Sequence, residues 1–201
     1  MKIIYEETNT YAEPVQSGEY PAVCYGFIDL GDQFGKYGWQ TKLALLWEIM
    51  DDSGGMPQTV DKIYTFSLGR GSALRRDLSS WRDRDFTHEE LSGGFDLTTV
   101  VGAPCMLTIS NKQRTNGYVY TNVDAVKPLP VTMDAREPRR RRIIFDLDTD
   151  DLSLLDLVPP RFAKMIKTSP QYKARAGIPT DSAQTSGQTD VPSTMDDEVP
   201  F

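Results

Sequence analysis

Hydrophobic and polar positions alternate in five short stretches of the chain. The clearest covers 42–50, where one face collects Leu43, Leu45, Trp47 and Ile49. This period of two is typical of a half-buried strand. β-Forming residues dominate four further runs, at 18–30, 62–68, 104–110 and 118–126. Loops rich in glycine, proline or polar residues separate the runs, among them 31–38, 51–58 and 111–117. The pattern therefore predicts five strands.

The hydrophobic period changes between the third and fourth runs. An amphipathic helix is predicted over 72–82, with Ser72 as its N-cap and a stripe formed by Leu74, Leu78 and Trp81. A second helix is predicted to begin at Thr87, which forms a capping box with Glu90. The staple positions around this capping box hold Phe86 and Leu91.

Three strands, a helical segment and two strands follow one another in this order. That order predicts a mainly β fold, a five-stranded OB-fold barrel with a helical insertion between strands 3 and 4. Trp47, Phe66 and Trp81 each fall on an apolar stripe, so we expect them in the core. Tyr64 shares a face with Phe66, and its placement stays open between core and surface.

The predicted barrel occupies 18–131, after a polar lead-in at 1–17, and an extension follows at 132–180. Within the extension, Pro159-Pro160 is expected to start a short α-helix with a stripe of Phe162, Met165 and Ile166, and Ser169-Pro170 begins a further turn. We expect this extension to dock on the barrel or on a second subunit, which leaves a homo-oligomer open.

Two charged segments of the extension can each be interpreted in two ways. Five arginines lie within 136–142. This segment is either a mobile arm that adds phosphate contacts or a hydrophilic linker. Asp146, Asp148 and Asp150 are spaced like the start of a calcium loop. Asp151 stands where that loop needs glycine and Leu157 where it needs glutamate, so we expect no metal site.

The last segment, 181–201, is acidic and polar. It holds five acids and no Lys or Arg, so the other 180 residues, with 24 acids and 22 bases, are near balance. Its composition predicts a disordered tether. The tip combines carboxylates with an apolar end, which suits capture by a partner with a basic, apolar pocket, through Asp196, Asp197, Glu198, Val199, Pro200 and Phe201. A solvated acidic terminus is the plain alternative.

Several segments resemble a group of bacteriophage-encoded OB-fold proteins regarded as single-stranded DNA-binding proteins. These segments are KIYTFSL at 62–68, LRRDLSSWRDRDFT at 74–87, the pair Phe95-Asp96 and VGAPCML at 101–107. The closing Asp-Asp-Glu-Val-Pro-Phe is similar to the tails of bacterial single-stranded DNA-binding proteins. The resemblance implies coating of single-stranded DNA during phage replication, recombination or repair, and recruitment of such proteins by the tip. One departure is Asp83, where a small residue such as glycine is expected.

Rings and cations that suit a single strand of DNA occur together in three places, because such binding needs stacking platforms beside a cationic path. The predicted binding residues are Phe34, Lys36, Tyr37, Trp39, Lys42, Lys62, Tyr64, Arg70, Lys112, Arg114, Tyr118 and Tyr120. Arginines of the predicted helix and the turn after it form a second rank, which is equally typical of a solvated face: Arg75, Arg76, Arg82 and Arg84.

Other functional classes find little support in the sequence. His88 is the only histidine, and no nucleophile elbow, phosphate loop or metal-ligand spacing occurs, so we expect no enzyme and no cofactor. Cys24 and Cys105 are expected as buried thiols. No apolar run could span a membrane and no signal pattern occurs near Met1, so we expect the host cytoplasm. The alternative function is an OB-fold adaptor that binds polypeptide.

Overall fold

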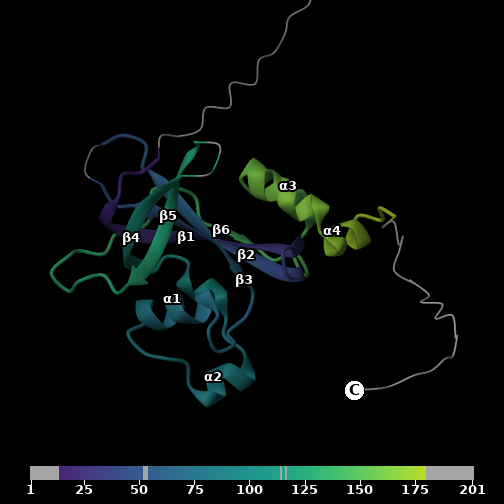
Figure 1. The fold of residues 1–201 in the computed structure, drawn as a ribbon, viewed down its shortest axis with the longest axis horizontal. Coiled ribbons are helices and arrows are strands. Elements are labelled where there is room, and N and C mark those ends of the chain that lie inside the picture. Colours follow the sequence, from purple (N-terminus) through teal and green to yellow (C-terminus); the bar gives the residue numbers. More distant parts are fainter. Residues whose placement is uncertain (1–13, 52–53, 114, 116, 180–201) are drawn as a thin grey trace, which may run out of the picture.

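The computed structural model describes residues 14–51, 54–113, 115 and 117–179. An antiparallel sheet forms its centre (Figure 1), with the order β3-β2-β1-β4-β5. The strands are β1 (Gly18–Gly35), β2 (Gly38–Ile49), β3 (Thr59–Thr65), β4 (Pro104–Gln113) and β5 (Val119–Lys127). The five predicted strands are thus present, and along the chain they follow one another as predicted, with the helices between the third and the fourth. The edge strands β3 and β5 come close to each other, with Cα atoms within 8 Å, but no hydrogen-bonded ladder joins them within the described part of the chain.

The first two strands extend further than the sequence pattern indicates. The predicted loop at 31–38 is wrong, because β1 continues to Gly35 and only residues 36 and 37 separate it from β2. Gly31 causes a bulge instead of a break: its φ is +65° and the register shifts between Asp29 and Gly31. A Cβ at Gly31 would lie 2.7 Å from Leu147 and 2.8 Å from Ser169, so the extension also requires glycine there.

The helical segment between β3 and β4 closes one side of the sheet. It contains α1 (Ala73–Trp81), α2 (His88–Gly93) and the 3-10 helix η1 (Leu97–Val100). The predicted caps are confirmed: Ser72 accepts a hydrogen bond from Arg75, and Thr87 and Glu90 form the reciprocal capping box. The α1 stripe packs against Leu43, Leu45 and Trp47 in one core, and the indole of Trp81 donates to the carbonyl of Pro104 at 2.8 Å.

The C-terminal extension covers the opposite face of β1 and β2. It comprises β6 (Ile143–Phe145), which pairs in parallel with residues 26–28 of β1, then η2 (Leu152–Leu157), α3 (Pro160–Thr168) and α4 (Pro170–Arg175). Phe145, Leu147, Phe162 and Ile166 are at most 1% exposed and form a second core with sheet residues that include Ile28, Leu30 and Leu46. The extension therefore docks on the chain's own sheet.

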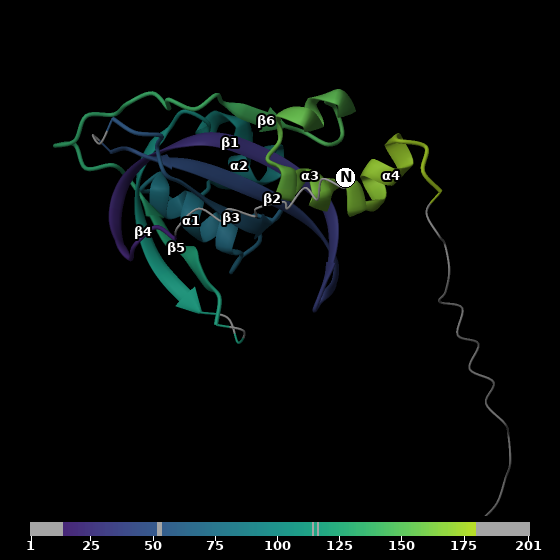
Figure 2. The same cartoon turned by 90° about the horizontal axis from the view of Figure 1, so that it is seen from above.

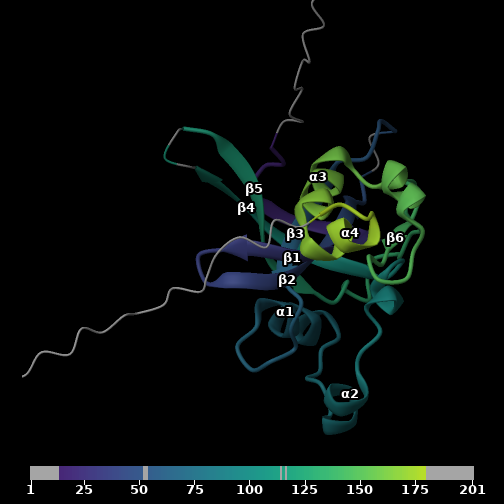
Figure 3. The ribbon, with the colours of Figure 1, turned by 90° about the vertical axis from the view of Figure 1, so that its right-hand side faces the viewer.

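Two hairpins project from the same side of the sheet. Figures 2 and 3 both show the β1–β2 and β4–β5 hairpins curving in one direction, with α1 at their base and α3 on the far side of β1 and β2.

Among the described residues, no helix is both long enough and apolar enough to cross a bilayer.

Candidate nucleic-acid interface

The tip of the β1–β2 hairpin carries a cluster of exposed rings. Phe34 and Trp39 are cross-strand partners and meet edge to face, with ring centroids 5.4 Å apart. They are 72% and 57% exposed, and Tyr37 in the turn is 78% exposed. Lys36 lies over the Tyr37 ring, 5.5 Å from its centroid. Large solvent-exposed rings on paired strands offer a stacking surface, so this cluster can receive bases.

Phe66 is a further exposed ring, although the sequence pattern predicts it in the core. It is 47% exposed and meets the buried Phe27 edge to face at 6.5 Å. Its backbone N–H donates to the carbonyl of Thr41 on β2. Phe66 comes directly after the last residue of β3, where the strand leaves the cover of α1, and this position is the signal that could have identified it. We call Phe34, Tyr37, Trp39 and Phe66 the ring surface.

Tyr64 and Lys62 belong to the core side of β3, which corrects their predicted place on the binding surface. Tyr64 is 3% exposed and donates its hydroxyl to Asp77 Oδ2 at 3.0 Å. Lys62 Nζ lies 2.7 Å from the same oxygen. Burial, and then the Asp77 carboxylate, raise the pKa of Tyr64 well above its usual value. An acid on α1 therefore holds both side chains inward, and neither ring nor cation is presented to a ligand.

Lys42 lies on the other face of the hairpin from Trp39. Alternation along β2 puts Trp39 and the buried Leu43 on one face and Lys42 on the other. Lys42 Nζ donates to Gln40 at 2.8 Å and to Thr65 at 2.7 Å. Both partners are neutral, so these hydrogen bonds orient the ammonium group of Lys42, and no acid among the described residues pairs with it.

The β4–β5 hairpin presents Lys112 and Tyr120 away from the core side. Lys112 pairs with Tyr120 across the strands, and alternation from the buried Ile109 places Lys112 on the opposite face. The Lys112 ammonium is 3.5 Å from Asp124. Tyr118 at the end of the hairpin is 40% exposed. Arg114 lies outside the described residues.

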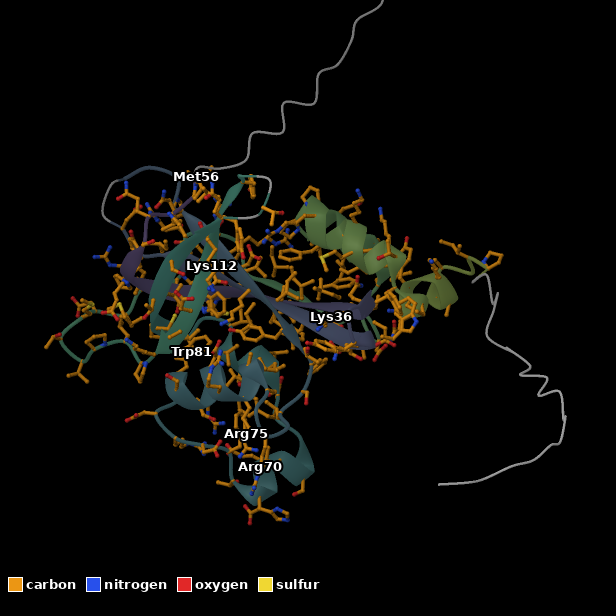
Figure 4. All side chains as sticks on the ribbon, viewed as in Figure 1. Lys36, Met56, Arg70, Arg75, Trp81 and Lys112 are labelled. Carbon is orange, nitrogen blue, oxygen red and sulfur yellow. The ribbon has the colours of Figure 1, made fainter. Side chains whose placement is uncertain are left out.

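Arg70 is separated from both hairpins. It is exposed in the turn between β3 and α1, and Figure 4 shows it at the end of the molecule formed by α1 and α2, away from Lys36 and Lys112. The structure thus brings the rings of one hairpin together with Lys36, and it distributes Lys42, Arg70 and Lys112 over other surfaces.

The second-rank arginines form internal contacts. Arg75 binds both oxygens of Asp85, at 3.1 and 2.8 Å, and Arg84 pairs with Glu90 at 2.8 Å. The hydrogen bond from Arg84, with that of the Thr87 N–H, lowers the pKa of Glu90 to about 2. Asp83 between these contacts has φ +53°, a left-handed backbone that favours glycine and explains the small residue expected there.

The arginine-rich segment 136–142 is anchored to the sheet by contacts with two carboxylates. The backbone N–H groups of Arg139 and Arg140 donate to the two oxygens of Glu48, at 2.9 and 2.8 Å, and Glu48 is 2% exposed. Arg139 also pairs with Asp51 at 3.0 Å. The backbone of the arm is therefore part of the fold, and its attachment satisfies a carboxylate that would otherwise be buried without partners.

Three carboxylates gather outside the ring surface. Asp29, Asp146 and Asp148 place one oxygen each within 4.8 Å of one another, so the rejected calcium loop gains an acid from β1. Burial raises the pKa of Asp29, and its carboxylate accepts the N–H of Gly31 at 2.9 Å. The backbone N–H groups of Asp146 and Asp148 are bonded to Asp150 and Asp146. Carboxylates of Asp29, Asp146 and Asp150 thus accept hydrogen bonds from nearby backbone N–H groups, and these local turns account for the clustering.

The predicted partner-binding tip, 196–201, lies outside the described residues. Comparison of the chain with protein-family models, curated proteins and solved structures finds no match.

Proposed function

We propose that this protein binds single-stranded DNA and coats it with little sequence preference, in phage DNA replication, recombination or repair. One observation carries the proposal: Phe34, Tyr37 and Trp39 stand exposed on one hairpin beside Lys36. Every base has a π-face, so stacking on such rings is tolerant of sequence and contributes about 1–3 kcal/mol per base.

We also propose that the sheet is a partly open OB-fold barrel. The strand order β3-β2-β1-β4-β5 brings the edge strands close, with α1 inserted between β3 and β4, and this supports the barrel. An OB-fold binds oligonucleotides through one sheet face and the hairpin loops. Here the extension covers the outer face of β1 and β2, so we assign DNA contact to the hairpins and to Phe66.

The test is titration of the full chain with a fluorescent oligo-dT. Tyr37→Ala with Trp39→Ala removes two stacking rings, so we expect a loss of affinity of about 2 kcal/mol or more, roughly thirtyfold. Met56→Ala is the matched control, because Met56 is 80% exposed on the loop between β2 and β3 and lies apart from Lys36 in Figure 4. For each tenfold rise in salt concentration, the logarithm of the wild-type binding constant should fall by about 0.7 per phosphate contact.

Three outcomes would contradict this function. They are an unchanged affinity in the double variant, an affinity insensitive to salt, and a preference for duplex DNA. The first would remove the ring surface from the interface and favour the adaptor that binds polypeptide. Removal of Pro200 and Phe201 should leave the oligo-dT affinity unchanged, because we assign the tip to partner proteins.

A further inference from the structure

A groove of about 550 Å³ lies between η2 and α3 on the C-terminal extension. Its lining combines apolar with charged and polar side chains. Two of the apolar ones, Leu155 and Val158, are only 5% and 4% exposed. Lys164 and Lys167 are exposed neighbours on one side of α3 along this groove. Neither lysine has an ion-pair partner within the described ranges. Among the described residues that line the groove, Asp156 is the one acid.

The chemistry of this groove matches the end of the same chain. Residues 196–201 present three side-chain carboxylates, an apolar Val-Pro-Phe and the carboxylate of Phe201. Such a ligand needs an apolar recess for its ring and cations for its carboxylates. We propose that the groove between η2 and α3 binds residues 196–201 of its own chain, with Phe201 against Leu155 and Val158 and the carboxylates beside Lys164 and Lys167.

The connection is long enough for docking within one molecule. The described chain ends at Pro179, just after α4, which follows α3 in Figures 1 and 2. Residues 180–195 can span up to about 50 Å when extended, whereas α4, with six residues, is about 9 Å long. A tether of this length gives an effective concentration of about a millimolar, which favours the tip of the same chain over that of a second copy.

Docking would place the tip in a groove that no residue of the ring surface lines. The groove lies on the extension, and the ring surface lies at the end of the β1–β2 hairpin and at Phe66. A partner protein that binds the tip must then displace it from the groove, so the groove regulates recruitment. This consequence rests on the proposed recruiting role of the tip, but the docking itself does not require DNA binding.

The experiment uses paramagnetic broadening in the full chain. Cys24 and Cys105 are 0% exposed, and burial raises the pKa of Cys24 to about 12, so a spin label should react only with the thiol introduced by Thr194→Cys. We expect loss of the amide signals of Ala163, Lys164 and Lys167. The signals should return at high salt, because the screening length falls to about 3 Å at 1 M.

Variants of the chain test separately the charges of the groove and the apolar anchor Phe201. Lys164→Glu with Lys167→Glu should restore the α3 signals, while Lys127→Glu with Lys173→Glu makes the same charge change outside the groove and should leave the broadening intact. Phe201→Ala keeps every carboxylate and should weaken the broadening. Broadening of Lys36 and Tyr37 in place of α3 would overturn the proposal, as would its absence or its dependence on dilution, which indicates a second copy. No DNA is present, so failure here is distinct from failure of DNA binding.

Discussion

The tip of the β1–β2 hairpin and the seam between β3 and α1 contain the same kinds of residue and use them in opposite ways. At the tip, Lys36 lies over Tyr37, which is 78% exposed. At the seam, Lys62 lies over Tyr64, which is 3% exposed. The difference is Asp77, which accepts hydrogen bonds from both seam residues. A ring and a cation become available to a ligand only where no acid of the fold pairs with them.

The largest expected effect comes from removing the acid of the seam. Asp77→Ala leaves the hydroxyl of Tyr64 buried without a partner and Lys62, 17% exposed, without its counter-ion, so we expect the free energy of unfolding to fall by about 3 kcal/mol. Urea unfolding measures this loss. Asp85→Ala, which removes an exposed pairing with Arg75, is the control and should cost clearly less. Equal losses would contradict the contrast between seam and surface.

A smaller effect is expected at Phe66, on DNA affinity. Phe66→Ala removes one ring of the ring surface, so oligo-dT affinity should fall by about 1 kcal/mol, roughly fivefold. Ile63→Ala is the matched control: Ile63 is 42% exposed on the opposite face of β3 and should leave the affinity unchanged. If Ile63 mattered and Phe66 did not, the DNA would lie on the outer face of the sheet.

The smallest effect concerns pH and the arginines after α1. The pKa of Glu90 is lowered from 4.5 to about 2 in the fold, so its stabilising contribution is fully present above pH 4.5 and is lost as the pH falls toward 2. The wild type should therefore exceed Glu90→Gln in thermal stability at neutral pH, and the two should converge in acid. Melting curves across this range test it. A difference that persists unchanged at the lowest pH would contradict the assigned role of Glu90.

The elements predicted best from sequence are those whose signal is local. Leu74, Leu78 and Trp81 define α1 through their spacing, and Ser72 caps it as predicted. The errors concern contacts between distant parts of the chain. Gly31 reads as a loop residue, yet it allows a bulge under Leu147 and Ser169. The environment of Tyr64 depends on Asp77, which lies on another element.

The sequence by itself determined the succession of strands and helices along the chain, the caps of α1 and α2, the near balance of charge before residue 181 and the aromatic character of the first hairpin. Periodicity, capping and composition act over a few residues. Only the tertiary structure decided which rings and cations remain available. It buried Tyr64, paired Arg75 and Arg84 with acids, and left Phe66 exposed. It also folded the extension over β1 and β2. The physical reason is that burial and ion pairing are set by neighbours in space.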